Sequence, residues 1–197
     1  MNYGVKYSIV QTVVPAAEPV SAAEAKTHMN VTLSTDDTLI GTYITAARLY
    51  VEKVLGRQLI TATYRLSLDD FPPEILLPYP PLGSITSITY TDTAGTSQTL
   101  ASTLYQTNSD IEPCRVKPSW GNVWPAVRLT DYNVVKVTYT AGYGAAGTNV
   151  PADILTAIKV ITANLYEFRE DIVTGTIVTD VPKVADNLLA PYRMYSF

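Results

Sequence analysis

Cysteine and histidine are almost absent from this sequence of 197 residues, which contains one of each, Cys114 and His28. A single cysteine cannot form an internal disulfide bond, and no group of cysteines and histidines has the spacing of metal ligands. A Ser/His/Asp or Cys/His catalytic site would have to use the lone histidine. We therefore predict no metal, no cofactor and no catalytic residue.

Charged residues are scarce as well. They make up 16% of the chain, whereas about a quarter is usual for a soluble domain. Lysine and arginine number 14 against 18 aspartates and glutamates, which gives a net charge of −4. The sequence thus lacks the basic footprint of a protein that grips nucleic acid. A mildly acidic wall would instead let DNA slide past without sticking.

Long hydrophobic runs are missing too. No segment approaches the ~18 apolar residues of a membrane-spanning helix. The first residues, MNYGVKYSIVQTVVP, have one lysine but no continuous apolar core and no clear small-residue cleavage site, which is unlike a signal peptide. We therefore expect a soluble protein that is made in a cytoplasm and has no membrane partner.

Tyrosine, in contrast, is abundant. Hydrophobic residues make up 47% of the chain, and 14 tyrosines stand against three phenylalanines. Tyrosine suits surfaces that are apolar yet wettable, as protein interfaces are. The composition favours a chain that buries surface against copies of itself. The alternative is that tyrosine replaces phenylalanine in a β-rich core.

Helix signals lie toward both ends of the chain. Ser21 and Glu24 have the spacing of a capping box and predict a short helix. A second, longer helix is predicted to begin with Ser34 as its cap and to stop at Gly56. A third follows Pro151, with apolar residues recurring at spacings of four and three.

In the middle of the chain, apolar and polar residues alternate as they do in β-strands. Residues 60–69 and 134–140 show the period of two of a half-buried strand. The turn at residues 92–95, Asp-Thr-Ala-Gly, predicts a hairpin. Further short strands are expected near Tyr105 and at residues 115–117.

Helices that enclose a run of strands predict an α+β fold. We expect a helical core of three to four helices, with a β-strand insertion between the second and third long helices. The predicted domains are an extended N-terminal arm at residues 1–20, the helical core at 21–58 and 150–190, the β-rich insertion at 59–149 and a C-terminal tail at 191–197.

Several sequence segments, and their order along the chain, resemble the head–tail connector, or adaptor, proteins of long-tailed bacteriophages. The later ones are the run VTYTAGYG, the VP that opens the next helix and the LYEFRED that closes it. Upstream, LPYPPLGSITSITYTDTAGTSQTL is similar to the family's proline-rich lead into a hairpin. VSAAEAKTHMNV and VLGRQL fit its opening helices. The resemblance covers roughly residues 19–192.

The resemblance implies a structural virion protein rather than an enzyme. Copies would form a closed ring, commonly of twelve, beneath the portal protein at the head–tail junction and around the DNA exit channel. The ring would bind the portal above and a stopper or tail-completion protein below, and would be assembled in the host cytoplasm. DNA would pass through the channel without sequence-specific binding, along a neutral or negative wall.

An enzyme remains the alternative from another class. A small hydrolase or nucleotide-binding enzyme would use Asp69, Asp70, Glu74 or His28. The three carboxylates precede or flank a Pro-Pro pair, which favours a solvated turn over acid–base chemistry. The glycine-rich AGYGAAG lacks both the GK[ST] ending of a phosphate loop and the G-x-G-x-x-G spacing.

Two tryptophans, Trp120 and Trp124, flank a Gly-Asn turn among basic residues. They could stack the bases of a single-stranded nucleic acid. The acidic balance of the chain favours loop packing or an interface between subunits. Tyr166 and Arg169, at the charged end of the third long helix, could contact a neighbouring subunit in the same way.

The C-terminal tail is the predicted portal-docking site. It is rich in apolar and aromatic residues, and Pro191 should interrupt any helix. Tyrosine and arginine are also enriched where binding energy concentrates. The alternative is that the tail folds back over its own core. The predicted docking residues are Leu188, Leu189, Pro191, Tyr192, Arg193, Met194, Tyr195 and Phe197.

Overall fold

The structure is a computed structural model that describes residues 6–168 and 183–194. Its helices and antiparallel sheets confirm the predicted α+β class. The chain divides into two compact units, each described by itself. The strand unit comprises residues 6–16 and Thr61–Tyr143, and the helical unit comprises Ala17–Ile60 with residues 144–168 and 183–194.

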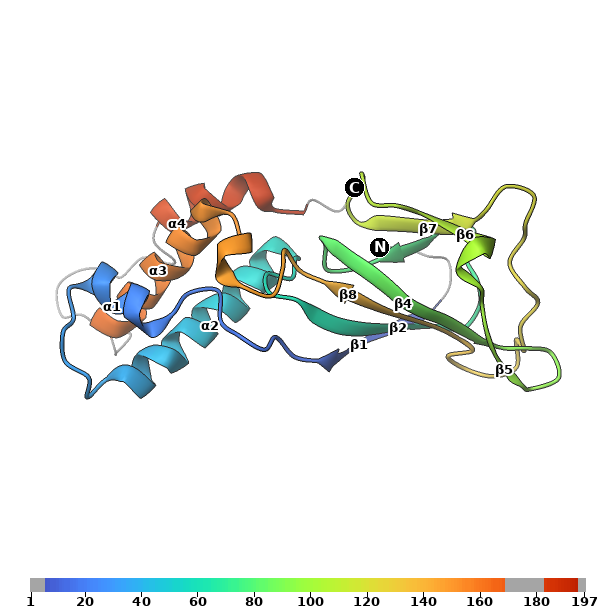
Figure 1. Cartoon of the computed structure of the whole chain (residues 1–197), viewed down its shortest axis with the longest axis horizontal. Helices are drawn as coiled ribbons and strands as arrows, with labels where there is room; N and C mark the ends of the chain where they lie inside the picture. Colours follow the sequence, from blue (N-terminus) through green and yellow to red (C-terminus); the bar gives the residue numbers. More distant parts are fainter. Residues whose placement is uncertain (1–5, 169–182, 195–197) are drawn as a thin grey trace. The chain divides into compact units, whose positions relative to one another are not determined.

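Four α-helices build the helical unit. They are α1 (Ala22–Met29), α2 (Asp37–Leu55), α3 (Ala152–Glu167) and α4 (Lys183–Leu189), shown in Figure 1. Both α2 and α3 contact neighbouring helices through buried aliphatic side chains, because each carries an apolar stripe at helical spacing. The buried residues of these two stripes include Ile40, Ile44, Val51, Ile154, Ile158 and Ile161.

Local capping explains where these helices begin and end. Ser21 and Glu24 form the predicted capping box at α1, in which Ser21 Oγ accepts from the Glu24 N–H at 3.2 Å. Gly56 ends α2 in the left-handed conformation at φ 67°, as predicted. The prediction of Ser34 as the cap of α2 is wrong. The cap is Asp36, because the helix starts two residues later.

The strand unit contains a five-stranded sheet in the order β1-β2-β8-β4-β5 and a three-stranded sheet in the order β3-β7-β6. All neighbours are antiparallel, and β2 and β8 pair in register from Ala62–Ala141 to Leu68–Val135. The strands are β1 (Tyr7–Val13), β2 (Ala62–Leu68), β3 (Ile75–Leu77), β4 (Leu82–Thr91), β5 (Ser97–Thr99), β6 (Tyr105–Asn108), β7 (Cys114–Pro118) and β8 (Val135–Ala141).

One hydrophobic core joins the two sheets. Alternate residues of β2 and β8 point into it and meet Ile75 and Val116 from the smaller sheet. Tyr139 is fully buried there, and its hydroxyl donates to the Pro78 carbonyl at 2.8 Å. The opposite residues of β2, β8 and β4 therefore form the outer face of the five-stranded sheet.

The N-terminal segment pairs with the sheet. Residues 7–13, which the sequence placed in an extended arm, form the edge strand β1 along β2. Ile9 packs on the core, but six of the seven residues of β1 are exposed. With so few buried positions, the segment shows little of the alternation by which a strand is recognised.

Candidate interaction surfaces

The loop between β7 and β8, residues 119–133, carries both tryptophans. Trp124 anchors it, because its ring stacks on Phe71 with centroids 4.8 Å apart and planes 9° apart. The Trp124 indole N–H also donates to the Pro72 carbonyl at 2.8 Å. Farther along, Asn133 N–H donates to Asp69 Oδ1 at 2.8 Å. The loop is therefore held at two places by side-chain hydrogen bonds.

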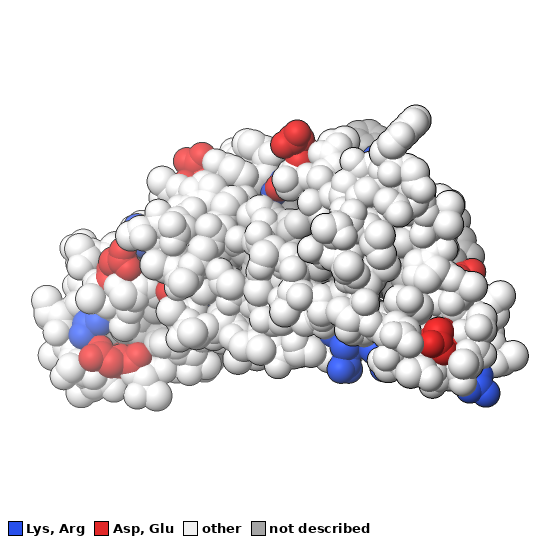
Figure 2. Space-filling model, turned by 45° about the vertical axis from the view of Figure 1, so that its right-hand side comes forward, with Lys and Arg blue, Asp and Glu red and all other residues white. Residues whose placement is uncertain are grey.

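Before Trp124 and between the two anchors, the loop presents large apolar side chains to solvent. Trp120 is 99% exposed, next to Gly121, whose φ of 78° turns the chain. Val123, Leu129 and Tyr132 are exposed by 86%, 70% and 80%. Figure 2 shows how sparsely charged side chains cover one face of the molecule. Apolar groups held in water on an anchored loop are typical of an interaction surface.

The two tryptophans thus have different surroundings. Trp120 is open to a partner, whereas one face of the Trp124 ring is covered by Phe71. Stacking of successive bases needs several open aromatic faces side by side. This loop does not offer the pair as such a platform, and the single-stranded nucleic-acid alternative loses its main support.

Tyr166 is tied to its own helical unit. Its hydroxyl donates to Asp36 Oδ2 at 2.7 Å, which links the end of α3 to the start of α2. The side chain is half-buried. Arg169, the other residue predicted at this interface, lies outside the described residues.

The segment after α4 folds back on the helical unit. Met194 N–H donates to the Leu55 carbonyl at 3.2 Å, and Arg57 Nε donates to the Tyr192 carbonyl at 2.6 Å. The Tyr192 hydroxyl donates to Asp153 Oδ2 at 3.2 Å. After α4, residues Ala190–Tyr192 form a short 3-10 turn.

These contacts decide which predicted docking residues are accessible. Leu189 is fully buried in this conformation, so its side chain is not accessible to a portal here. Leu188, Tyr192, Arg193 and Met194 are half-buried, and Pro191 is exposed. Tyr195 and Phe197 lie outside the described residues.

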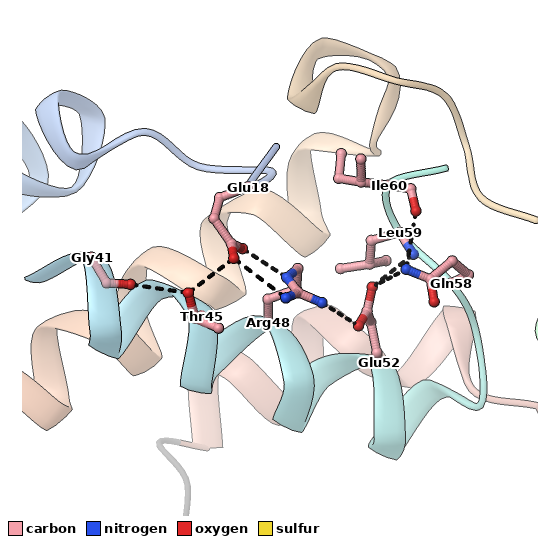
Figure 3. A network of polar contacts seen from close by, with 8 residues as sticks. All are labelled: Glu18, Gly41, Thr45, Arg48, Glu52, Gln58, Leu59 and Ile60. Carbon is pink, nitrogen blue, oxygen red and sulfur yellow. Dashed lines mark hydrogen bonds and ion pairs between the residues drawn. The ribbon is translucent and has the colours of Figure 1, made fainter. Parts of the chain in front are cut away.

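A polar network that we did not predict lies inside the helical unit. Arg48 Nε donates to Glu18 Oε2 at 2.7 Å, and its Nη1 donates to Glu52 Oε2 at 2.8 Å (Figure 3). Glu52 also accepts from the Gln58 side chain at 2.7 Å and the Leu59 N–H at 3.1 Å. The signal in the sequence was an arginine within the apolar stripe of α2, four residues before a glutamate.

Burial governs the electrostatics of this network. Arg48 is only 8% exposed, which is unusual for an arginine unless it is paired. Removal from water raises the pKa of the Glu52 carboxyl, although Arg48 and the Leu59 N–H act in the opposite direction. The network joins residue 18, helix α2 and the chain that leaves it, so we interpret it as a structural clasp.

The residues considered for catalysis do not form a catalytic group. Asp69 accepts from Asn133 N–H, Asp70 accepts from the neighbouring Phe71 N–H at 2.7 Å, and Glu74 pairs with Arg115 at 3.3 Å. His28 lies in the last turn of α1. Among the described residues, no three histidine, cysteine or acidic side chains are grouped to hold a metal ion. No described helix is long and apolar enough to cross a membrane.

Nearly half of the chain matches a known protein family. Residues 21–113 match the family model described as phage gp6-like head–tail connector protein. This match covers α1, α2 and strands β2 to β6, including the upstream segments that carried the resemblance. The recognition of a head–tail connector protein from the sequence is thereby confirmed. The matched family is one of structural connector proteins, not of enzymes.

Solved structures share the fold over nearly the whole chain. The chain is 20% identical to a chain in the neck of an empty GTA particle computed with C6 symmetry, with a TM-score of 0.80 and 96% and 97% of the two chains covered. A chain in the virion of a native gene transfer agent particle is 22% identical, with a TM-score of 0.79 and 96% of each chain covered.

A third similar chain lies in the neck of a native GTA particle computed with C12 symmetry. It is 21% identical, with a TM-score of 0.76 and 96% and 97% of the two chains covered. At these identities the likeness establishes the fold. No curated protein matches the sequence.

Proposed function

We propose that the chain, which matches the head–tail connector family over residues 21–113, acts as the adaptor beneath the portal of a phage-like particle. Copies form a closed ring around the DNA exit channel. The ring joins the portal on one side to a stopper or tail-completion protein on the other. It is assembled in the host cytoplasm and remains in the virion, and DNA passes through it without sequence-specific binding.

One observation carries this proposal. The fold is shared over 96% of the chain with proteins whose particle necks were computed with C6 and C12 symmetry. A cyclic symmetry operator of this kind repeats one heterologous contact until the ring closes. The low fraction of charged residues supports the proposal, because the buried centre of an interface between copies is poor in charged side chains.

The loop at residues 119–133 is our candidate for the contact between subunits or with the next protein of the neck. Trp120 would be its anchor, because a large aromatic side chain that is fully exposed gains most from burial in a partner. Trp124 would then act indirectly, by holding the loop in place through Phe71 and Pro72.

Replacing the exposed tryptophan tests this contact. We expect Trp120→Ala to leave the fold intact but to reduce the number of particles with a complete neck, counted by electron microscopy. Leu33→Ala is the matched control, because Leu33 is also an exposed large apolar residue, at 69%, and lies outside the loop. Complete necks in normal number with Trp120→Ala would remove the loop from the interface.

Portal docking by the C-terminal tail needs a truncation that spares the fold. Deleting residues 191–197 would also remove the bonds from Arg57 to Tyr192 and from Met194 to Leu55. Deleting residues 195–197 leaves both bonds in place. We expect the shorter deletion to give a folded protein that no longer joins portal-containing heads. Normal joining would show that Tyr195 and Phe197 do not dock.

A further inference from the structure

The outer face of the five-stranded sheet is covered by hydroxyl groups and cations. Its strands pair so that Ser8 lies opposite Ser67, Ser67 opposite Lys136, and Lys136 opposite Thr89. In the adjacent row, Val10, Arg65, Thr138 and Ser87 follow one another across the sheet. The row beyond contains Thr63, Thr140 and Ser84. The edge strand adds two exposed valines to these rows, Val10 opposite Arg65 and Val13 opposite Thr63.

Arg65 and Lys136 are both exposed at the centre of this face. Neither forms an ion pair or a side-chain hydrogen bond within the described part of the chain. The other described arginines each bond to a carboxylate or a backbone carbonyl: Arg48, Arg57, Arg115, Arg128 and Arg193. Arg65 is therefore unusual in this protein, because its charge has not been neutralised by the fold.

The acidic side chain at the edge of the face is already engaged. Asp69 follows β2 and accepts the Asn133 N–H at 2.8 Å. Lys6 is exposed beside it, since Asp69 N–H donates to the Lys6 carbonyl. The face thus keeps a local positive charge even though the chain as a whole is at −4.

We propose that this outer face contacts the phosphodiester backbone of double-stranded DNA. Phosphate oxygens accept hydrogen bonds from arginine, lysine and the hydroxyls of serine and threonine, and such contacts position a protein without reading sequence. Arg65, Lys136 and the hydroxyls of Thr63, Ser87, Thr89 and Thr138 supply these donors. The other hydroxyls of the rows are already engaged or buried: Ser8 donates to Asn133, Ser84 and Thr140 bond to each other, and Ser67 is 7% exposed. The rows contain no aromatic side chain on which an unpaired base could stack, so the chemistry favours the backbone of a duplex over a single strand.

The spacing of the two cations fits this ligand. Arg65 lies opposite Thr138 and Ser67 lies opposite Lys136, so Arg65 and Lys136 are diagonal neighbours on adjacent strands. Diagonal neighbours are ~7–8 Å apart. A DNA strand presents one phosphate for every ~3.4 Å of helix axis. Two cations at this separation can therefore reach different phosphates of the same strand.

This inference rests on the proposed function, because the DNA in question is the DNA that passes through the ring. It also modifies our expectation of a neutral or negative wall. Two isolated cations among uncharged hydroxyls attract a duplex weakly and at any sequence. A duplex held so weakly can still slide.

Neutralising the two cations tests the proposal with the full chain. Fluorescence anisotropy measures binding to a short labelled DNA duplex. We expect wild-type protein to bind the duplex at low salt, with an affinity that falls as salt is added. Arg65→Gln with Lys136→Gln should weaken binding and lower the slope of log affinity against log salt by about 2, one unit for each phosphate that is no longer neutralised. Duplexes of different sequence should behave alike.

The matched control is Lys53→Gln with Lys117→Gln. It removes the same charge from two exposed lysines outside the sheet face and should leave the slope unchanged. An equal loss in this control, or wild-type protein that shows no salt-sensitive binding at low salt, would overturn the proposal. So would an altered association between copies of the Arg65/Lys136 variant with unchanged DNA binding, because the face would then contact a second copy.

The particle separates this inference from the proposed function. Particles that carry the Arg65/Lys136 variant should assemble complete necks, since the loop proposed as the contact, residues 119–133, contains neither residue. Missing necks with unchanged DNA binding in solution would contradict the inference and leave the adaptor role standing. Complete necks with weakened DNA binding would support both.

Discussion

At the scale of single residues, Arg48 and Glu52 hold the polar network inside the helical unit together. Arg48 bonds to carboxylates on both sides, and Glu52 collects hydrogen bonds from the chain just beyond α2. A buried ion pair contributes little more to the free energy of unfolding than a well-packed apolar pair would. Removing one partner, however, leaves an uncompensated charge. The network therefore makes two predictions.

Arg48→Ala should lower the free energy of unfolding by about 3–5 kcal/mol, because Glu52 and Glu18 would lose their cation in a largely buried site. Urea unfolding followed by circular dichroism measures this loss. Arg65→Ala is the control, since an exposed and unpaired arginine should change stability by no more than about 0.5 kcal/mol. Equal effects of the two substitutions would contradict the clasp.

The second prediction concerns pH. Burial raises the pKa of Glu52 above its ordinary 4.5, so the folded chain takes up this proton at a higher pH than the unfolded chain. Where the folded state binds more protons, stability rises as pH falls. Between neutral pH and about 4.5, the wild type should therefore gain stability relative to Glu52→Gln. A constant difference across this range would show that Glu52 titrates normally.

At the scale of elements, short local motifs set where helices begin and how loops are held. The capping box of α1 uses Ser21 and Glu24, whose carboxylate accepts from the Ser21 N–H at 2.8 Å. These hydrogen bonds also lower the pKa of Glu24. The loop at residues 119–133 is attached by the Trp124 ring and by a short backbone pairing, in which Val127 bridges Asp92 and the Arg128 N–H donates to the Thr91 carbonyl at 3.1 Å.

Ser21→Ala should destabilise the protein by about 1 kcal/mol, since a helix N-terminus loses its side-chain acceptor. Ser34→Ala is the matched control. Ser34 precedes α2 but does not cap it, so little change is expected. Thermal unfolding measures both. A loss with Ser34→Ala as large as that with Ser21→Ala would mean that the capping bond contributes nothing specific.

Trp124→Ala should cost about 2–3 kcal/mol, somewhat less than the loss of a fully buried tryptophan, because the ring is half-buried on Phe71. Trp120→Ala removes the same atoms from an exposed position and should leave stability within about 0.5 kcal/mol. Chemical unfolding of both variants makes the comparison. Similar losses would mean that Trp120 also packs on the fold.

At the scale of the whole molecule, the chain passes from β1 of the strand unit to the first two helices, returns to complete the strand unit and then forms the rest of the helical unit. The only cysteine, Cys114, lies in the strand unit, where it is 2% exposed in the core. Burial raises the pKa of its thiol, so the reactive thiolate is rare in the folded protein.

Thiol labelling should therefore report on unfolding of the strand unit. We expect the folded protein to react slowly with a chromogenic thiol reagent, and one thiol per chain to become reactive as urea is added. The labelling transition should coincide with the loss of β-sheet circular dichroism. Fast labelling in the absence of urea would contradict the buried position of Cys114. Because one cysteine cannot form an internal disulfide, a reducing agent should not change the stability of the monomer.

The sequence by itself determined what depends on residues close together along the chain. The capping box of α1, the glycine stop of α2 and the alternation of β2 and β8 were all predicted correctly. Hydrogen bonds and burial within one helix or strand follow from neighbours a few positions away. The α+β class followed from the order of these elements along the chain. The family resemblance followed from sequence segments within and between the same elements.

Tertiary structure alone decided contacts between residues far apart in the chain. Glu18 meets Arg48, Phe71 meets Trp124, Asp36 meets Tyr166, and the C-terminal segment meets Leu55 and Asp153. The edge strand β1 and the hydroxyl-rich outer face likewise exist only after distant strands have paired. Such pairings depend on how complete elements pack, and no local spacing encodes which surfaces will meet.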